Sequence, residues 1–127
     1  MISNEKEINA IISLAGPERF FRFVKVVADR QEVWGLYREG WALAQSDEGE
    51  KVFPLWPARE YAELCAVSEW DGYKAEPIEL ENFLNNLLPQ LAIDGVLPGV
   101  FYTPTDKGVT PSVNILKAAI EKELENY

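Results

Sequence analysis

The segment from Glu32 to Leu64 reads EVWGLYREGWALAQSDEGEKVFPLWPAREYAEL and carries three of the four tryptophans of the 127-residue chain. Apolar residues recur within three short stretches, 32–38, 41–45 and 51–57, and this pattern predicts three β-strands. Glu39-Gly40 and the acidic stretch 46–50 separate them, and glycine supplies the positive φ that tight turns need. The segment therefore predicts a three-stranded antiparallel meander.

Turn chemistry also predicts a register for this meander. The first turn is expected to pair Arg38 with Trp41, and the next to pair Trp41 with Trp56; Trp34 then lies opposite Gln45. Strand residues alternate between faces, so one face receives Trp34, Leu36, Trp41, Leu43 and Val52, and the other receives Val33, Tyr37, Ala42, Ala44, Phe53 and Leu55. Because both faces are apolar, we expect both to be covered, or one to be a contact surface.

Helical periodicity predicts about five helices around the sheet. They are expected within 3–16, with Ser3 or Asn4 as cap, and within 17–30, 58–70, 81–95 and 112–127, the last started by Thr110-Pro111. In the second helix, Arg19, Arg22 and Lys25 are expected to lie mostly away from the buried stripe. Further strands are expected around Ile78 and from Val96 to Tyr102, and Pro89 is expected to kink or interrupt the fourth helix. The expected fold is a single α+β domain over residues 1–127.

The charge balance restricts the classes of partner. The formal net charge is -9, from 12 Lys and Arg against 21 Asp and Glu, so the surface repels phosphate backbones and anionic membranes. A basic protein or a cation is the favoured kind of partner, although acidity also keeps a small protein soluble. One cysteine, no secretory signal pattern and no membrane-spanning apolar stretch predict a reducing, cytoplasmic location.

Several catalytic chemistries lack their residues or motifs. There are no histidines, which excludes Ser-His-Asp and Cys-His catalysis and removes the commonest zinc ligand. Cys65 lies on an amphipathic helix and is expected to be a buried, inert thiol. Neither a Walker loop nor a dinucleotide-binding fingerprint is present. Counting cannot exclude a hydrolase that uses two carboxylates, but the sequence favours a non-enzymatic protein without metal or cofactor.

Most of the tryptophan surface is expected to be core, and the rest is the candidate contact face, with Trp34, Tyr37, Trp41, Trp56 and Tyr61 as its residues. A protein-interaction module is the favoured function, and one version is an immunity-like inhibitor of a basic partner. The alternatives are a homodimer formed through sheet faces or edges, and a small-ligand binder in which four aromatic residues form a cage: Trp34, Tyr37, Trp41 and Trp56.

The central block resembles the small bacterial proteins grouped as domain of unknown function 2750. The resemblance extends over nearly the whole chain, through FFRFVKVVADRQEVWGLY, GWALAQSDEGEKVFPLWP, EYAELCA, IELENFLNNLLPQLAIDGV and FYTPTDKGV. It implies a cytoplasmic bacterial protein and no particular activity, substrate or catalytic residue. The family pattern falls, without an assigned role, on Trp34, Gly35, Trp41, Asp47, Gly49, Phe53, Pro54, Trp56, Pro57 and Tyr61.

Overall fold

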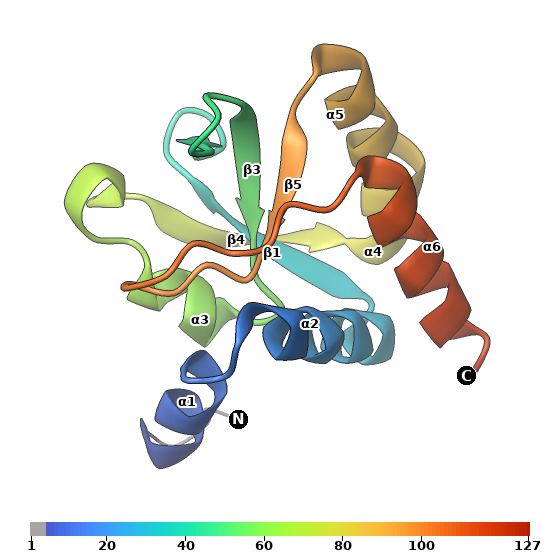
Figure 1. The fold of residues 1–127 in the computed structure, drawn as a ribbon, viewed down its shortest axis with the longest axis horizontal. Coiled ribbons are helices and arrows are strands. Elements are labelled where there is room, and N and C mark those ends of the chain that lie inside the picture. The colour runs from blue at the N-terminus through green and yellow to red at the C-terminus, as the bar shows by residue number, and fades with distance from the viewer. Residues whose placement is uncertain (1–4) are drawn as a thin grey trace.

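The structure is a computed structural model that describes residues 5–127 (Figure 1). The expected cap at Ser3 or Asn4 lies outside these residues. The helices are α1 (Glu5–Ile12), α2 (Gly16–Arg30), α3 (Arg59–Leu64), α4 (Leu80–Asn82), α5 (Leu88–Asp94) and α6 (Val113–Leu124), with a 3₁₀ turn at Ser68–Trp70 and a π-helical stretch at Phe83–Leu87. The strands are β1 (Glu32–Tyr37), β2 (Ala44–Gln45), β3 (Lys51–Leu55), β4 (Lys74–Glu79) and β5 (Leu97–Val100).

These strands form two small sheets. β1 pairs with β4 in antiparallel orientation, while β3 lies between β2, which is antiparallel to it, and β5, which is parallel to it. Figure 1 shows the β1–β4 pair crossing the direction of β3 and β5. The predicted α+β class with mostly antiparallel strands and about five helices is confirmed, because α4, the π-helical stretch and α5 follow one another as a single helical segment.

The meander itself is a wrong detail of that prediction. β1 takes β4 as its neighbour, with Trp34 opposite Pro77, and touches the second predicted strand only at the bridge between Tyr37 and Trp41. The turn is one residue longer than expected, and Glu39 within it adopts φ 57°. Local alternation indicates that a strand exists but does not say which distant segment pairs with it, and here the partner lies some forty residues downstream.

Two tryptophans join the two sheets through their backbones. The N–H of Trp34 donates to the carbonyl of Trp56 at 2.9 Å, and the N–H of Trp56 donates back at 2.8 Å. Trp41 was predicted to occupy the position opposite Trp56. The exchange between Trp34 and Trp56 ties β1 to the end of β3, so the tryptophan-rich segment connects the two sheets of the molecule.

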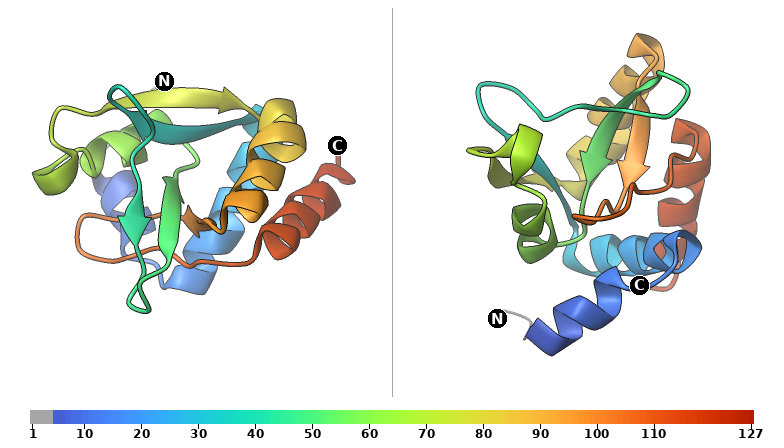
Figure 2. Two further views of the ribbon diagram at one scale, coloured as in Figure 1. Left: turned by 90° about the horizontal axis from the view of Figure 1, so that it is seen from above. Right: turned by 60° about the vertical axis from the view of Figure 1, so that its left-hand side comes forward.

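The prediction that both faces of these strands are covered is confirmed for most of their length. Four consecutive residues of β1, from Val33 to Leu36, and four of β3, from Val52 to Leu55, are buried. α2 and α6 lie side by side against this core (Figure 2). They contribute Phe23, Val27, Leu116 and Ile120, which are all inaccessible to solvent. Tyr37 and Leu43 are the exceptions in the segment, because each leaves more than two fifths of its surface exposed.

Two helix-boundary predictions have different outcomes. Pro89 lies in the first turn of α5, directly after the π-helical stretch, so the helix continues past it through a widened turn. Such a turn accommodates proline, which lacks an N–H and whose ring crowds the preceding turn. The predicted cap of α6 at Thr110-Pro111 is wrong, because Ser112 is the N-cap and its hydroxyl accepts the N–H of Ile115 at 3.1 Å.

Candidate functional site

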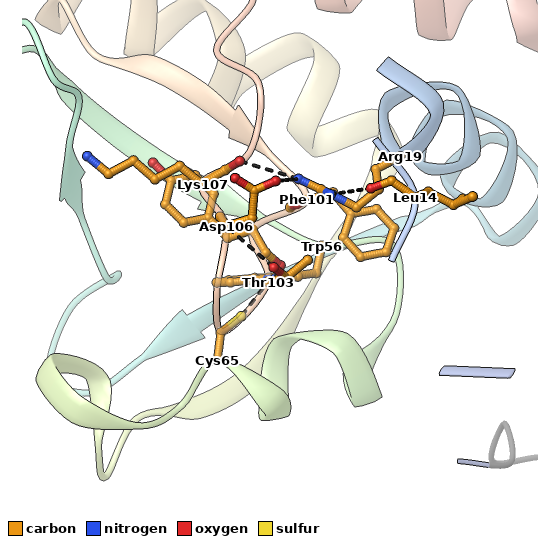
Figure 3. A network of polar contacts seen from close by, with 9 residues as sticks. Leu14, Arg19, Trp56, Cys65, Phe101, Thr103, Asp106 and Lys107 are labelled. Atoms are coloured by element: carbon orange, nitrogen blue, oxygen red, sulfur yellow. Dashed lines mark hydrogen bonds and ion pairs between the residues drawn. The ribbon is translucent and has the colours of Figure 1, made fainter. Parts of the chain in front are cut away.

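A buried arginine organises the chain that follows β5 (Figure 3). Arg19 was predicted to lie mostly away from the buried stripe of α2, and this prediction is wrong, because its side chain is only 2% exposed. The guanidinium donates from Nε to the carbonyl of Phe101 at 3.1 Å and from Nη1 to that of Leu14 at 2.5 Å. Nη2 donates to the carboxylate of Asp106 at 2.9 Å and to the carbonyl of Lys107 at 3.3 Å. One side chain therefore fixes both ends of the loop at residues 101–107.

The same loop is held from its other side by two buried side chains. Trp56 Nε1 and Cys65 Sγ both donate to the carbonyl of Tyr102, at 2.9 and 3.5 Å. Phe101 adopts φ 65°, a left-handed conformation that a bulky residue rarely occupies. Three anchored side chains thus compensate for an unfavourable backbone conformation, which indicates a rigid, preorganised loop.

A polar cleft of about 400 Å³ opens beside this loop. Its lining includes Ser68, Glu69, Trp70, Tyr102, Asp106 and Lys107. Burial raises the pKa of the Tyr102 hydroxyl, and nearby Lys107 opposes that rise. Lys107 hydrogen-bonds the carboxylate of Asp47 at 2.9 Å, which lowers the pKa of Asp47, although both side chains are more than half exposed. The carboxylate of Asp106 accepts a hydrogen bond from Arg19, so its role is to hold the loop in place.

Cys65 is expected to resist alkylation while the protein is folded. Its thiol is buried, and burial raises its pKa from about 9 to about 11, so the reactive thiolate is scarce at pH 8. We expect iodoacetamide followed by mass spectrometry to show modification only in denaturant. Because the unfolded thiol ionises at lower pH than the folded one, its contribution to stability is complete below pH 9 and declines towards pH 11. Rapid labelling of the native protein would contradict the burial.

The chain reverses after β1 in a short hairpin end, closed by the single bridge between Tyr37 and Trp41, and this end carries a different kind of surface. Tyr37 and Trp41 form an edge-to-face pair with ring centroids 5.1 Å apart and an interplanar angle of 82°. Trp41 also packs on Phe53, with centroids 5.7 Å apart. Gly35 provides the space for it, because a Cβ there would lie 2.8 Å from the Trp41 ring. The indole is thereby held against the β1–β4 ribbon, and Tyr37 stands beside it with 43% of its surface exposed.

This aromatic pair forms part of a shallow, open surface depression that we call the aromatic slot. Tyr37, Trp41, Glu76 and Pro77 line it, and its volume is about 340 Å³. In the register of β1 and β4, Glu76 lies opposite Gly35. Directly opposed residues share a face, so the Glu76 carboxylate lies on the face over which the Trp41 ring packs. The slot therefore combines two aromatic rings with a negatively charged group.

The five residues of the predicted contact face occupy different environments. Trp34 and Tyr61 are buried, and Trp56 has no exposed surface at all. Only Tyr37 and Trp41 reach the aromatic slot, so the four-residue cage is not assembled. Trp34 instead donates from Nε1 to Glu32 at 2.8 Å and carries the guanidinium of Arg59 5.1 Å from its ring centroid.

Sequence reasoning missed Glu76 and Arg19. Glu76 is identifiable only once the pairing of β1 with β4 is known, because it lies far from the tryptophan block. Arg19 did have a signal, since it lies four and eight residues before the buried Phe23 and Val27 and therefore on the same stripe of α2. A basic residue on an apolar helical stripe indicates a buried network as readily as a surface charge.

Over residues 5–127, no group of three or more Cys, Asp and Glu side chains is arranged to hold a metal ion. Within the same range, no helix combines the length and the apolar character needed to cross a membrane.

Comparison with known proteins gives one match. A family model described as a protein of unknown function (DUF2750) matches residues 20–120. Neither the curated proteins nor the solved structures include a significant match.

Proposed function

Because the chain belongs to the DUF2750 family of proteins of unknown function, we propose its role from its own surface: a non-enzymatic protein-interaction module that binds a basic partner. The contact region is the hairpin-end face, defined as Tyr37, Trp41 and Leu43. The observation that carries the proposal is the exposure of Tyr37 and Leu43, at 43% and 48%, within a segment that buries most of its other large apolar residues and leaves Trp41 half-buried.

The character of this face supports a protein partner. Tyrosine and tryptophan are enriched at protein interfaces because they combine a large apolar area with few rotatable bonds. Trp41 is fixed by Gly35 and Phe53, so little side-chain entropy remains to be lost when a partner binds. A rigid aromatic anchor two residues along the chain from an exposed leucine suits the centre of a small interface.

The charge of the molecule supports a basic partner. A net charge of -9 attracts positively charged proteins over long range and raises their rate of association. Close to the hairpin-end face, exposed Glu39 and Glu76 supply negative charge beside the basic Arg38 and Lys74, so the net acidity of the whole molecule is the main attraction for a basic partner. Two copies of this chain would repel one another through the same charge, so we favour a basic protein over a homodimer. An inhibitor that neutralises a basic partner is one form of such a module.

Affinity capture with matched variants tests the proposal. Wild type, Tyr37→Ala, Leu43→Ala and the control Ile93→Ala are immobilised and exposed to a lysate of the source cells. Ile93 is 78% exposed on α5. Its variant therefore removes an exposed aliphatic side chain of the same size as leucine from a different part of the surface. A candidate partner is then purified, and its affinity for each variant is measured at low and moderate salt.

We expect a basic partner whose affinity falls about tenfold or more in Tyr37→Ala and Leu43→Ala, as for residues central to an interface, and which Ile93→Ala still binds. Binding should also weaken as salt rises. A partner that binds all variants equally would overturn the assignment of the face. Sedimentation of the wild type as a dimer that Tyr37→Ala abolishes would place a second copy there instead.

A further inference from the structure

We infer that the aromatic slot receives one arginine side chain of the partner. This inference rests on the proposed function, because it names the group that a basic protein would insert beside Tyr37 and Trp41. The slot has a volume of about 340 Å³ and is lined by Tyr37, Trp41, Glu76 and Pro77. It is open to solvent and large enough for a side chain, and its lining combines three apolar residues with one carboxylate.

The arrangement of the walls suits a planar cation. The two rings contact each other edge to face, at 82° and with centroids 5.1 Å apart, so a planar group stacks on the outer face of one ring and not between the two. A cation near an aromatic face is attracted by the negative potential of the ring. Glu76 is exposed and supplies the opposite charge from the facing strand, so a cation in the slot contacts both kinds of attractive group.

Arginine fits these groups better than lysine does. Its guanidinium is planar, stacks on aromatic rings and can donate two parallel hydrogen bonds to a carboxylate. An ammonium is more strongly hydrated and acts as a point charge. The chain already contains such a contact on the same strand, where Arg59 lies over Trp34 with its guanidinium carbon 5.1 Å from the ring centroid.

Two basic residues of this chain, Arg38 and Lys74, lie near the slot. Arg38 is directed away, because its Nη1 donates to the carbonyl of Asp71 at 3.5 Å and its guanidinium packs close to Gly72. Lys74 lies opposite Tyr37 in the register, so its ammonium is a competing cation on the same face. Removing that charge in Lys74→Ala should therefore strengthen the binding of an added arginine group.

Small-molecule probes test the slot without requiring the partner. N-acetyl-arginine amide, N-acetyl-lysine amide and the neutral isostere N-acetyl-citrulline amide are titrated into the protein. The indole N–H signal of Trp41, assigned by its disappearance in Trp41→Phe, reports occupancy in NMR spectra. The variant is Glu76→Gln. Its matched control is Glu79→Gln, which makes the same charge change on the same strand but on the opposite face.

We expect arginine amide to shift the Trp41 signal, with lysine amide weaker and citrulline amide without effect. Glu76→Gln should weaken arginine binding about five- to tenfold, as loss of a charge-assisted hydrogen bond does, while Glu79→Gln leaves it unchanged. Tighter binding of lysine, equal binding of citrulline, or equal loss in both glutamate variants would overturn the inference. So would the absence of any shift with arginine amide.

The two proposals fail in different ways. A purified partner that needs Tyr37 but is neither weakened by Glu76→Gln nor displaced by arginine amide would leave the interaction face standing and overturn the arginine slot. A slot that binds arginine amide while the partner ignores Tyr37→Ala would leave the ligand chemistry standing and overturn the hairpin-end face as the site of protein binding.

Discussion

Replacing Arg19 with methionine is expected to lower the free energy of unfolding by about 2–5 kcal/mol, because a buried side chain that donates four hydrogen bonds is lost. Methionine fills much of the same volume but donates no hydrogen bond. The carbonyls of Leu14 and Phe101 would lose the bonds that Arg19 now donates, and an unsatisfied buried acceptor costs roughly 1–3 kcal/mol. Urea denaturation followed by circular dichroism measures the loss.

Three companion variants separate the sources of this effect. Arg22→Met removes an exposed arginine from the next turn of α2 and should change stability by less than about 0.5 kcal/mol. Asp106→Asn removes only the ion pair, whose carboxylate is 61% exposed, and should cost less than about 1 kcal/mol. The loss of stability in Arg19→Lys should be larger than that in Asp106→Asn and smaller than that in Arg19→Met. If Asp106→Asn were as damaging as Arg19→Met, the ion pair and not the backbone carbonyls would carry the stabilisation.

The composition of the tryptophan-rich segment predicted the core better than it predicted the connectivity. Apolar residues on both sides of each strand required two covered faces, and burial of Val33, Leu36 and Leu55 follows from that requirement. The pairing of β1 with β4 did not follow, because a strand's neighbour depends on long-range packing. Glu39 also adopts a left-handed conformation, which is uncommon for glutamate and therefore could not be predicted from its residue type.

Only the aromatic part of the candidate site could be predicted from the sequence, because the rest depends on long-range strand pairing. Tyr37 and Trp41 belong to one local hairpin end, where the bridge between them brings their rings together. Glu76 enters the slot only through the register of a distant strand. Local patterns thus identify the aromatic part of a site, whereas its charged part requires the tertiary pairing.

Truncating Trp56 to alanine is expected to destabilise the protein by about 3–5 kcal/mol, the range for a buried tryptophan or phenylalanine. Trp56 is fully buried and packs edge-to-face on Trp70, with centroids 6.1 Å apart. Its Nε1 also donates to the carbonyl of Tyr102, so the variant creates a cavity and weakens an anchor of the loop. Guanidinium denaturation measures the stability, and hydrogen exchange measures the protection of residues 101–107.

Trp56→Phe keeps a buried aromatic ring in place of the indole, so it removes the N–H donor while leaving a much smaller cavity than Trp56→Ala does. We expect a loss of about 1–3 kcal/mol, since the Tyr102 carbonyl would retain only the weaker Cys65 donor, together with faster exchange in the loop. The matched control, Trp41→Phe, makes the same change in a half-buried indole and should cost less while disturbing the aromatic slot. If Trp41→Phe proved the more destabilising, Trp41 would be the main core anchor, and the division of the segment into a buried bridge and an exposed contact face would fail.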